Sequence, residues 1–136
     1  MSGMFNECFS LEELNLSNFD TRKTKFMTSI FAGCSSLKFL DNFNFNTNNM
    51  SYMFYECVSL EEIIISNFDT ESINDMGYLF YKCLSVKKIN ISNFNTKNVK
   101  NMKNMFSGCL FEKLNLSNFN TNNVTDMSGM LGKCLA

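Results

Sequence analysis

Apolar positions along this chain repeat with a long period that six cysteines mark. Successive cysteines are separated by 26, 23, 26, 26 and 25 residues, and a pair of apolar residues precedes each one. The six pairs are Met4-Phe5, Ile30-Phe31, Met53-Phe54, Leu79-Phe80, Met105-Phe106 and Met130-Leu131. A recurring period of this length indicates a protein built from stacked structural repeats.

A short segment with apolar residues two positions apart follows each of the first five cysteines. The segments are residues 14–16, 40–42, 63–65, 89–91 and 114–116. This alternation predicts a strand with one buried face, although Asn42 interrupts it in the second copy. A further apolar residue three positions before each segment completes the L-x-x-L-x-L signature of a leucine-rich repeat. These residues are Leu11, Leu37, Leu60, Val86 and Phe111.

The motif S-N-F-[DN]-T follows the strand segments at residues 17–21, 66–70, 92–96 and 117–121, and residues 43–47 are a variant of it. Asn, Asp, Ser and Thr side chains bond to nearby backbone and favour turns. We expect the asparagines to form a ladder that bonds to the turn backbone of adjacent repeats. We also expect the phenylalanines to stack as one buried column, formed by Phe19, Phe45, Phe68, Phe94 and Phe119.

The segment that returns to each cysteine has apolar residues about three positions apart, which predicts a short 3₁₀ or α-helical turn. In the fifth copy these residues are Val99, Met102, Met105, Phe106 and Cys109. The third copy is three residues shorter before its cysteine yet keeps Met50, Met53, Phe54 and Cys57 in register. The loss of about one helical turn would leave the inward face unchanged.

The predicted fold is therefore a leucine-rich-repeat-like solenoid, with parallel β-strands on one face and short helical or 3₁₀ return segments. Residues 1–136 form a single solenoid of about five repeats of 23–26 residues, which starts and ends within a repeat and has no evident caps. Uncapped ends would expose apolar residues and strand edges, so we expect self-association. An array of paired helices is the alternative, but the segments are short and rich in Asn and Ser.

These motifs resemble the BspA-like leucine-rich repeat family over nearly the whole chain. The family pattern L-x-x-L-x-L-S-N-F-[DN]-T…V-x-x-M-x-x-M-F-x-x-C matches at Val99 to Cys109 and again at Val124, Met127, Met130 and Cys134. The resemblance implies a cell-surface or secreted protein, adhesion to host or matrix proteins, and no catalytic residues. The chain itself shows neither a leader nor an anchor.

Composition argues against catalysis and against nucleic-acid binding. The chain has no histidine, which is the usual general base and metal ligand. It also has no phosphate-binding loop, and we expect neither an enzyme nor a cofactor. The formal net charge is −1 with mixed signs, which disfavours a nucleic-acid partner. No run of apolar residues is long enough to span a membrane.

The cysteines and the ten methionines fall at equivalent repeat positions, which favours packing over chemistry. No C-x-x-C pair occurs, so we expect no metal site. Stacked repeats would bring equivalent thiols close together, which leaves disulfides open, but a ladder of buried free thiols is the favoured interpretation.

Charged residues beside the strands alternate in sign from repeat to repeat, which predicts ion pairs between repeats, each worth at most about 1 kcal/mol. They are Glu12, Lys38, Glu61, Lys87 and Glu112. A solvated face with accidental alternation is the alternative.

The next outward positions form the exposed strand face, where apolar residues near the second and third strands suggest a site for a protein partner. This candidate face consists of Glu13, Asn15, Phe39, Asp41, Phe43, Glu62, Ile64, Lys88, Asn90, Lys113 and Asn115. Irregular core packing in a degenerate repeat would explain Phe39, Phe43 and Ile64 equally well. The functional hypothesis is a protein-interaction module that uses this face, and the alternative is a structural spacer in a larger protein.

Overall fold

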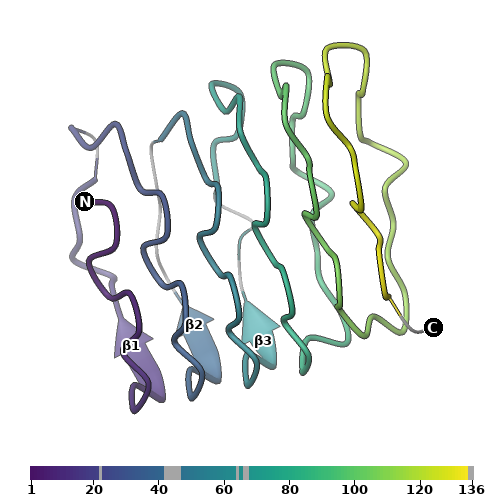
Figure 1. The fold of residues 1–136 in the computed structure, drawn as a ribbon. Coiled ribbons are helices and arrows are strands. Elements are labelled where there is room, and N and C mark those ends of the chain that lie inside the picture. Colours follow the sequence, from purple (N-terminus) through teal and green to yellow (C-terminus); the bar gives the residue numbers. More distant parts are fainter. Residues whose placement is uncertain (22, 42–46, 64, 66–67, 135–136) are drawn as a thin grey trace.

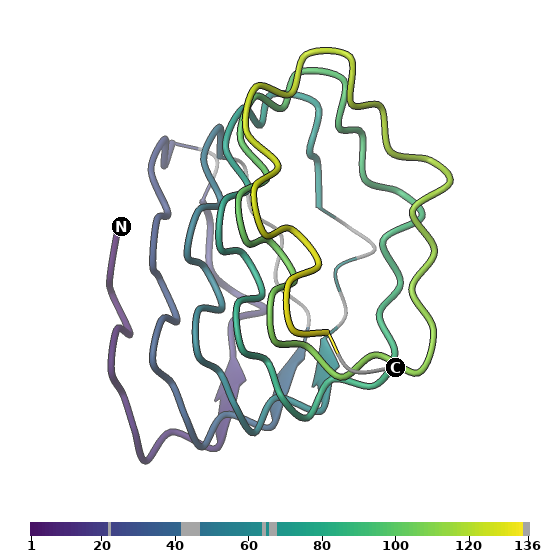
Figure 2. The same ribbon diagram turned by 45° about the vertical axis from the view of Figure 1, so that its right-hand side comes forward.

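Successive sequence repeats form successive loops of chain that lie side by side in a row. The computed structural model describes residues 1–21, 23–41, 47–63, 65 and 68–134. The two termini lie at opposite ends of the row (Figure 1), and a view turned by 45° shows the same arrangement (Figure 2). We number the repeats 1 to 6 after their cysteines, and we call the eight residues that end at each cysteine its return segment. The cysteines are Cys8, Cys34, Cys57, Cys83, Cys109 and Cys134.

Three short strands from repeats 1 to 3 form a parallel sheet in the order β1-β2-β3. The strands are β1 (Glu13–Asn15), β2 (Phe39–Asp41) and β3 (Glu62–Ile63). Leu14 pairs with Leu40, and Leu40 pairs with Ile63, so equivalent residues of the repeats are in register. The parallel strands predicted for these repeats are therefore confirmed, although Asn42 and Ile64 lie outside the described residues.

The strands predicted at residues 89–91 and 114–116 are wrong in detail. Within the described residues, repeats 4 and 5 are joined there only by one parallel bridge, between Lys88 and Lys113. Two like charges directly opposite each other disfavour a longer ladder.

The return segments are consecutive turns, and the predicted 3₁₀ or α-helical conformation is wrong: the described part of the chain contains no helix. In repeat 3 the N–H of Met53 bonds to the carbonyl of Met50, and the N–H of Cys57 bonds to that of Phe54. Tyr52 and Glu56 have φ of 59° and 55°, so each is the third residue of a type II turn. Two such turns point the first, fourth, fifth and eighth residues inward, which is the same spacing that suggested a helix.

The N–H groups that the turns leave free bond to the neighbouring repeat. In repeat 3, the N–H groups of Tyr52, Phe54 and Glu56 bond to the carbonyls of the next return segment at 2.8–3.0 Å. Repeats 1, 2, 4 and 5 use the same alternate positions. A helix would use these N–H groups for hydrogen bonds within its own segment. A helical return segment could therefore not form the hydrogen bonds that join neighbouring repeats.

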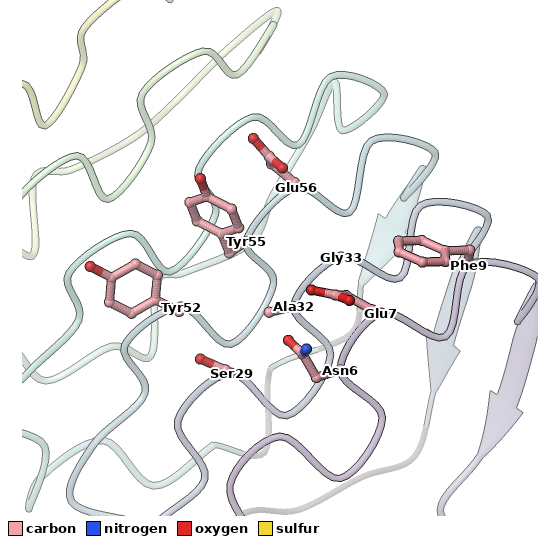
Figure 3. Close-up of a pocket in the computed structure, with 9 residues that line it drawn as sticks. All are labelled: Asn6, Glu7, Phe9, Ser29, Ala32, Gly33, Tyr52, Tyr55 and Glu56. Carbon is pink, nitrogen blue, oxygen red and sulfur yellow. The ribbon is translucent and has the colours of Figure 1, made fainter.

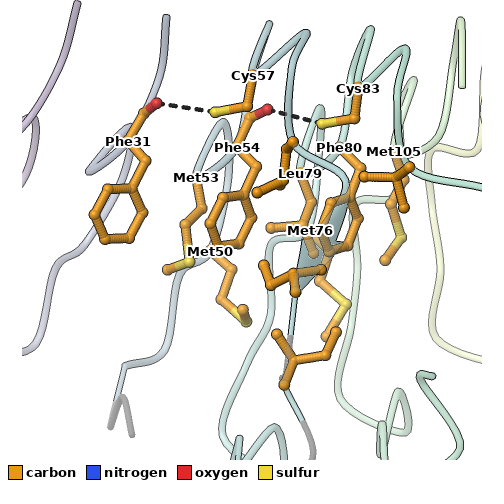
Figure 4. Close-up of a cluster of buried hydrophobic side chains, with 14 of the residues drawn as sticks. Phe31, Met50, Met53, Phe54, Cys57, Met76, Leu79, Phe80, Cys83 and Met105 are labelled. Atoms are coloured by element: carbon orange, nitrogen blue, oxygen red, sulfur yellow. Dashed lines mark hydrogen bonds between the residues drawn. The ribbon is translucent and has the colours of Figure 1, made fainter. Parts of the chain in front are cut away.

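The core lies between the sheet and the return segments. A stack of parallel phenylalanine rings runs through it, with centroids of consecutive rings 5.5–5.8 Å apart (Figure 4). This stack consists of Phe5, Phe31, Phe54, Phe80 and Phe106. Methionines at equivalent inward positions are buried around it, which confirms their packing role in repeats 2 to 5. They are Met27, Met50, Met53, Met76, Met102 and Met105.

The column predicted from the S-N-F motif is correct only in part. Phe68 and Phe94 are buried and Phe119 is partly buried, but Phe19 is 42% exposed. Phe19 belongs to repeat 1, where no described repeat lies before it to cover the ring. Phe45 lies outside the described residues.

The predicted asparagine ladder is confirmed for Asn93 and Asn118. The Asn118 amide donates to the carbonyls of Ile91 and Phe94 in the repeat before it, at 3.1 and 3.0 Å. Asn93 makes the equivalent bonds to Ile65 and Phe68. Each amide therefore crosslinks two neighbouring turns. At Ile91 and Ile65 it adds a second hydrogen bond to a carbonyl that already accepts a backbone N–H within its own turn.

Repeats 1 and 6 expose several apolar side chains. The exposed residues are Met4, Phe9, Phe19, Met127 and Leu131. Except for Phe9, the same repeat positions are buried in the middle of the row, where a neighbour covers both sides. The position of Phe9 is exposed in repeats 4 and 5 as well, at Leu84 and Leu110.

Replacement of single phenylalanines by alanine should distinguish a buried ring of the stack from an exposed ring of repeat 1. We expect Phe54→Ala to lower the free energy of unfolding by about 3–5 kcal/mol, because it opens a cavity between two stacked rings. Phe19→Ala removes an exposed ring and should lower it by less than about 1 kcal/mol. Urea unfolding followed by circular dichroism measures both, and equal losses would contradict this assignment of the stack.

The positive φ angles of the return segments give a second prediction. Ser29 has a φ of 57°, in the left-handed region that glycine adopts without strain. Ser29→Gly should therefore raise the free energy of unfolding by about 0.5–1 kcal/mol, because the relief of backbone strain exceeds the larger conformational entropy that glycine loses on folding. Ala32 lies in the same segment without a positive φ, and Ala32→Gly should lower it by a similar amount. A loss of stability in both variants would rule out the turn assignment.

Candidate protein-interaction surfaces

The strand face places most of its predicted residues in solvent. Asp41 lies opposite Asn15 in the sheet register, whereas Phe43 and Ile64 lie outside the described residues. The remaining eight side chains are exposed: Glu13, Asn15, Phe39, Glu62, Lys88, Asn90, Lys113 and Asn115. The structure therefore brings these eight residues to the protein surface.

Phe39 is the one described aromatic ring on this face. Its side chain is 42% exposed and lies in β2 between Glu13 of β1 and Glu62 of β3. Because Phe39 points outward from a regular strand, irregular core packing does not explain it. The ring is isolated from other aromatic side chains among the described residues of the face.

Three asparagines of the face have a structural task. The side-chain oxygens of Asn15, Asn90 and Asn115 accept hydrogen bonds from the backbone N–H two residues later, at 2.9, 3.2 and 3.0 Å. Such bonds hold the turn that ends each strand segment. Their recurrence in the sequence therefore follows from turn formation.

The charge column beside the strands forms ion pairs between repeats, as predicted. Lys38 lies 2.9 Å from Glu12, and Lys87 lies 4.0 Å from Glu112. Lys88 of the outward face also approaches Glu112, at 3.8 Å. All of these side chains are well exposed, so each pair adds little stability and mainly favours correct register.

A second surface, which the sequence reasoning missed, lies on the outer side of the return segments. All four tyrosines of the chain occur there, at the third and sixth positions of two adjacent return segments. We call Tyr52, Tyr55, Tyr78 and Tyr81 the tyrosine cluster. The signal was available, because the equivalent positions in the other repeats carry small or polar residues.

The rings of the tyrosine cluster stack across the two repeats in two columns. Tyr52 and Tyr78 have centroids 4.7 Å apart and planes 8° apart, and Tyr55 and Tyr81 are 5.0 Å and 10° apart. Within each repeat the two rings also touch, at 5.6 Å in repeat 3 and 5.5 Å in repeat 4. Figure 3 shows Tyr52 and Tyr55 beside the small side chains of repeat 2.

Charged groups border this cluster. The Lys82 ammonium lies 5.3 Å from the centroid of the Tyr81 ring and 2.7 Å from a Glu56 carboxylate oxygen. The hydrogen bond to Glu56 raises the pKa of Lys82, so its charge is retained. Burial raises the pKa of Tyr52 and Tyr55, and both hydroxyls stay protonated and able to donate hydrogen bonds.

The predicted ladder of free thiols is confirmed. All six cysteines are unpaired, and those of repeats 2 to 6 donate to the phenylalanine carbonyl of the preceding repeat at 2.9–3.2 Å. Figure 4 shows two of these bonds, from Cys57 to Phe31 and from Cys83 to Phe54. Burial raises the pKa of Cys34 from 9.0 to about 11 and that of Cys109 to about 12, so these two thiols are unreactive near neutral pH. In the described part of the chain, no group of three or more His, Cys, Asp or Glu could hold a metal ion.

One protein family matches the chain, under the description "Mycoplasma protein of unknown function, DUF285". The match covers residues 1–62 and, a second time, residues 38–136. The chain belongs to this family. The two overlapping matches agree with its internal repeats. No curated protein and no solved structure matches this DUF285 protein.

Among the described residues, none forms a helix long and apolar enough to cross a membrane.

The buried thiols make the stability of this DUF285 protein sensitive to alkaline pH. Burial raises the pKa of Cys34 from 9.0 to about 11. Between these two pKa values the thiol ionises in the unfolded chain but stays protonated in the folded protein. The contribution of the Cys34 thiol to the free energy of unfolding is therefore fully present below pH 9 and is lost as the pH rises from about 9 to about 11. We expect the urea midpoint to fall over this window.

The variant Cys34→Ser is the control, since serine can still donate to the Phe5 carbonyl but does not titrate. Tyrosines and lysines titrate over the same range, so the prediction concerns the difference between the two proteins. The fall should be shallower in the variant, and parallel pH profiles would show that this thiol makes no contribution.

Proposed function

We propose that the chain is a leucine-rich-repeat-like solenoid that acts as a protein-interaction module. Three observations support the architecture: the repeat period, the parallel register of β1 to β3, and backbone hydrogen bonds between equivalent positions of neighbouring repeats. The resemblance to BspA-like proteins agrees with this proposal and extends it to adhesion at a cell surface.

The observation that carries the interaction function is the tyrosine cluster. Tyrosine is enriched at the energetic centres of protein interfaces, because its rigid ring buries a large area while its hydroxyl can donate a hydrogen bond. Four tyrosines gathered on two adjacent repeats present such a surface. Tyr52 at the edge of the cluster is 38% exposed, so it is available to a partner.

A stabilising role within the fold is the plain alternative for these rings. Stacked aromatic pairs contribute about 0.5–1.5 kcal/mol beyond their buried area. However, repeats 2 and 5 have Ser29 and Asn104 where the tyrosines Tyr52 and Tyr78 stand, and these repeats stack with the same backbone bonds. The fold therefore does not require rings at these positions.

The strand face remains a second candidate surface within the same function, because Phe39 stands exposed there. A structural spacer without a ligand is the alternative function. In that case, substitutions on either surface would leave binding unaffected. Self-association through the exposed end repeats is a further proposal, since Met4, Phe9 and Leu131 have no cover within the described chain.

Binding to purified matrix proteins tests the interaction function. The immobilised chain is exposed to fibronectin, laminin and collagen separately, and the response is followed by biolayer interferometry. We expect saturable binding to at least one of them. The double variant Tyr52→Ser/Tyr78→Ser should weaken it at least tenfold, because it removes one whole column of the tyrosine cluster.

Matched variants separate the alternatives. Asn104→Ser changes the same return-segment position in repeat 5 and should leave binding unchanged, and thermal unfolding checks that all variants are folded. If Phe39→Ser abolishes binding and the tyrosine variant does not, the strand face is the site. The absence of binding to all three proteins would reject the matrix-adhesion proposal and favour the spacer.

A further inference from the structure

A column of charged side chains on the outer surface of the return segments is interrupted by glycine in repeats 2 and 5. The column is formed by the seventh residues of the return segments, and in repeats 1 to 4 these are Glu7, Gly33, Glu56 and Lys82. Every one of these residues has a positive φ. Glycine 33 therefore leaves an empty side-chain position between two carboxylates.

Repeat 4 shows what a cation does at this position. Lys82 has a φ of 55°, and its ammonium lies 2.7 Å from Glu56 of the repeat before it. The same ammonium lies 5.3 Å from the Tyr81 ring centroid. The position of the Lys82 side chain is thus fixed by two contacts: an ion pair with a carboxylate of the preceding repeat and a cation–π contact with an aromatic ring of its own repeat.

A cavity of about 520 Å³ occupies the place of the missing side chain in repeat 2. Its floor consists of Ser29, Ala32 and Gly33, the three small residues at the outward positions of that return segment. Large residues of repeats 1 and 3 rise on either side of this floor (Figure 3). The walls are Asn6, Glu7 and Phe9 from repeat 1, and Tyr52, Tyr55 and Glu56 from repeat 3.

The cavity combines negative charge with aromatic walls. Two carboxylates line it, and none of its lining residues is basic. Lys82 approaches Glu56 from the far side, in repeat 4, whereas Glu7 has no ion pair within the described residues. Phe9 is 58% exposed, so its ring is free to contact an aliphatic chain.

We propose that this cavity binds an arginine or lysine side chain from an extended segment of a protein partner. The aliphatic stem lies against Phe9 and Tyr55, and the cationic head lies between Glu7 and Glu56, where it completes the column that Gly33 interrupts. This inference rests on the proposed interaction function and names the chemistry of the partner.

A lysine built into the chain should block the site. Gly33→Lys places the occupant of the cavity on the protein itself, and Lys82 and Lys133 show that lysine is accepted at this φ. The added Cβ would lie 3.1 Å from the flexible Glu7 side chain. Gly108→Lys is a matched control, because its φ is also positive and its Cβ would lie 3.2 Å from the Lys82 side chain, away from the cavity.

The test is a titration of the ¹⁵N-labelled chain with acetylated, amidated five-residue peptides that differ only in a central Arg, Lys or Gln. We expect saturable shifts of the Ala32, Gly33 and Tyr55 amides with the Arg and Lys peptides, and at least tenfold weaker binding of the Gln peptide. Gly33→Lys should weaken binding of the Arg peptide at least tenfold, and Gly108→Lys should not.

Three results would overturn the proposal: no shifts with the Arg and Lys peptides, equal binding of the Gln peptide, or equal effects of the two lysine variants. A further arm uses tetramethylammonium. If it binds more tightly than the Arg peptide, the cavity is a site for a small ammonium compound and the peptide proposal is wrong. The matrix-adhesion proposal is tested with whole matrix proteins and the tyrosine variants, whereas this proposal is tested with short peptides and the lysine variants. Failure of one proposal can therefore be distinguished from failure of the other.

Discussion

The hydrogen bonds between the return segments of neighbouring repeats are the constraint on which the rest of the structure depends. In repeats 1 to 5, each return segment donates alternate N–H groups to the next repeat, and other N–H groups of the segment close its turns. To do so with L-amino acids, the backbone adopts a positive φ at the third and seventh positions of all six return segments. The strain at these positions is the cost of stacking, and glycine relieves it at one position in four of the six repeats, through Gly3, Gly33, Gly108 and Gly129.

Once the backbones are in register, every inward position becomes a column of identical neighbours. The carbonyl of Phe54 accepts both the turn N–H of Cys57 and the thiol of Cys83. The buried cysteine is thus a small apolar residue that also satisfies the second lone pair of a buried carbonyl. In the described part of the chain, no buried side-chain polar atom lacks a partner. This satisfaction explains why the same few residue types recur at the inward positions.

The sequence was sufficient to predict the repeat, the parallel strands of repeats 1 to 3, the thiol ladder and the asparagine ladder, because each follows from a position that recurs. It was insufficient for the return segments, because consecutive type II turns and a helix place apolar residues at the same spacing. Glycines at the third or seventh position, such as Gly33, were the distinguishing signal. The S-N-F phenylalanines failed as a uniform column because Phe19 lies in an end repeat, and burial there depends on neighbours that a periodic pattern does not show.

The candidate sites were harder to predict because they arise where the repeats differ. Periodicity identifies the positions that stacking constrains. It carries no information about outward positions, where the residues vary from repeat to repeat. Yet the tyrosine cluster and the cavity both come from one abrupt difference: repeat 2 has Ser29, Ala32 and Gly33 at three outward positions, and repeat 3 has Tyr52, Tyr55 and Glu56. In a row of stacked repeats, such a difference becomes a step in the surface, since the backbone spacing is the same on both sides. A repeat protein can therefore form a binding site by changing side-chain size between two neighbours, without any change in its backbone.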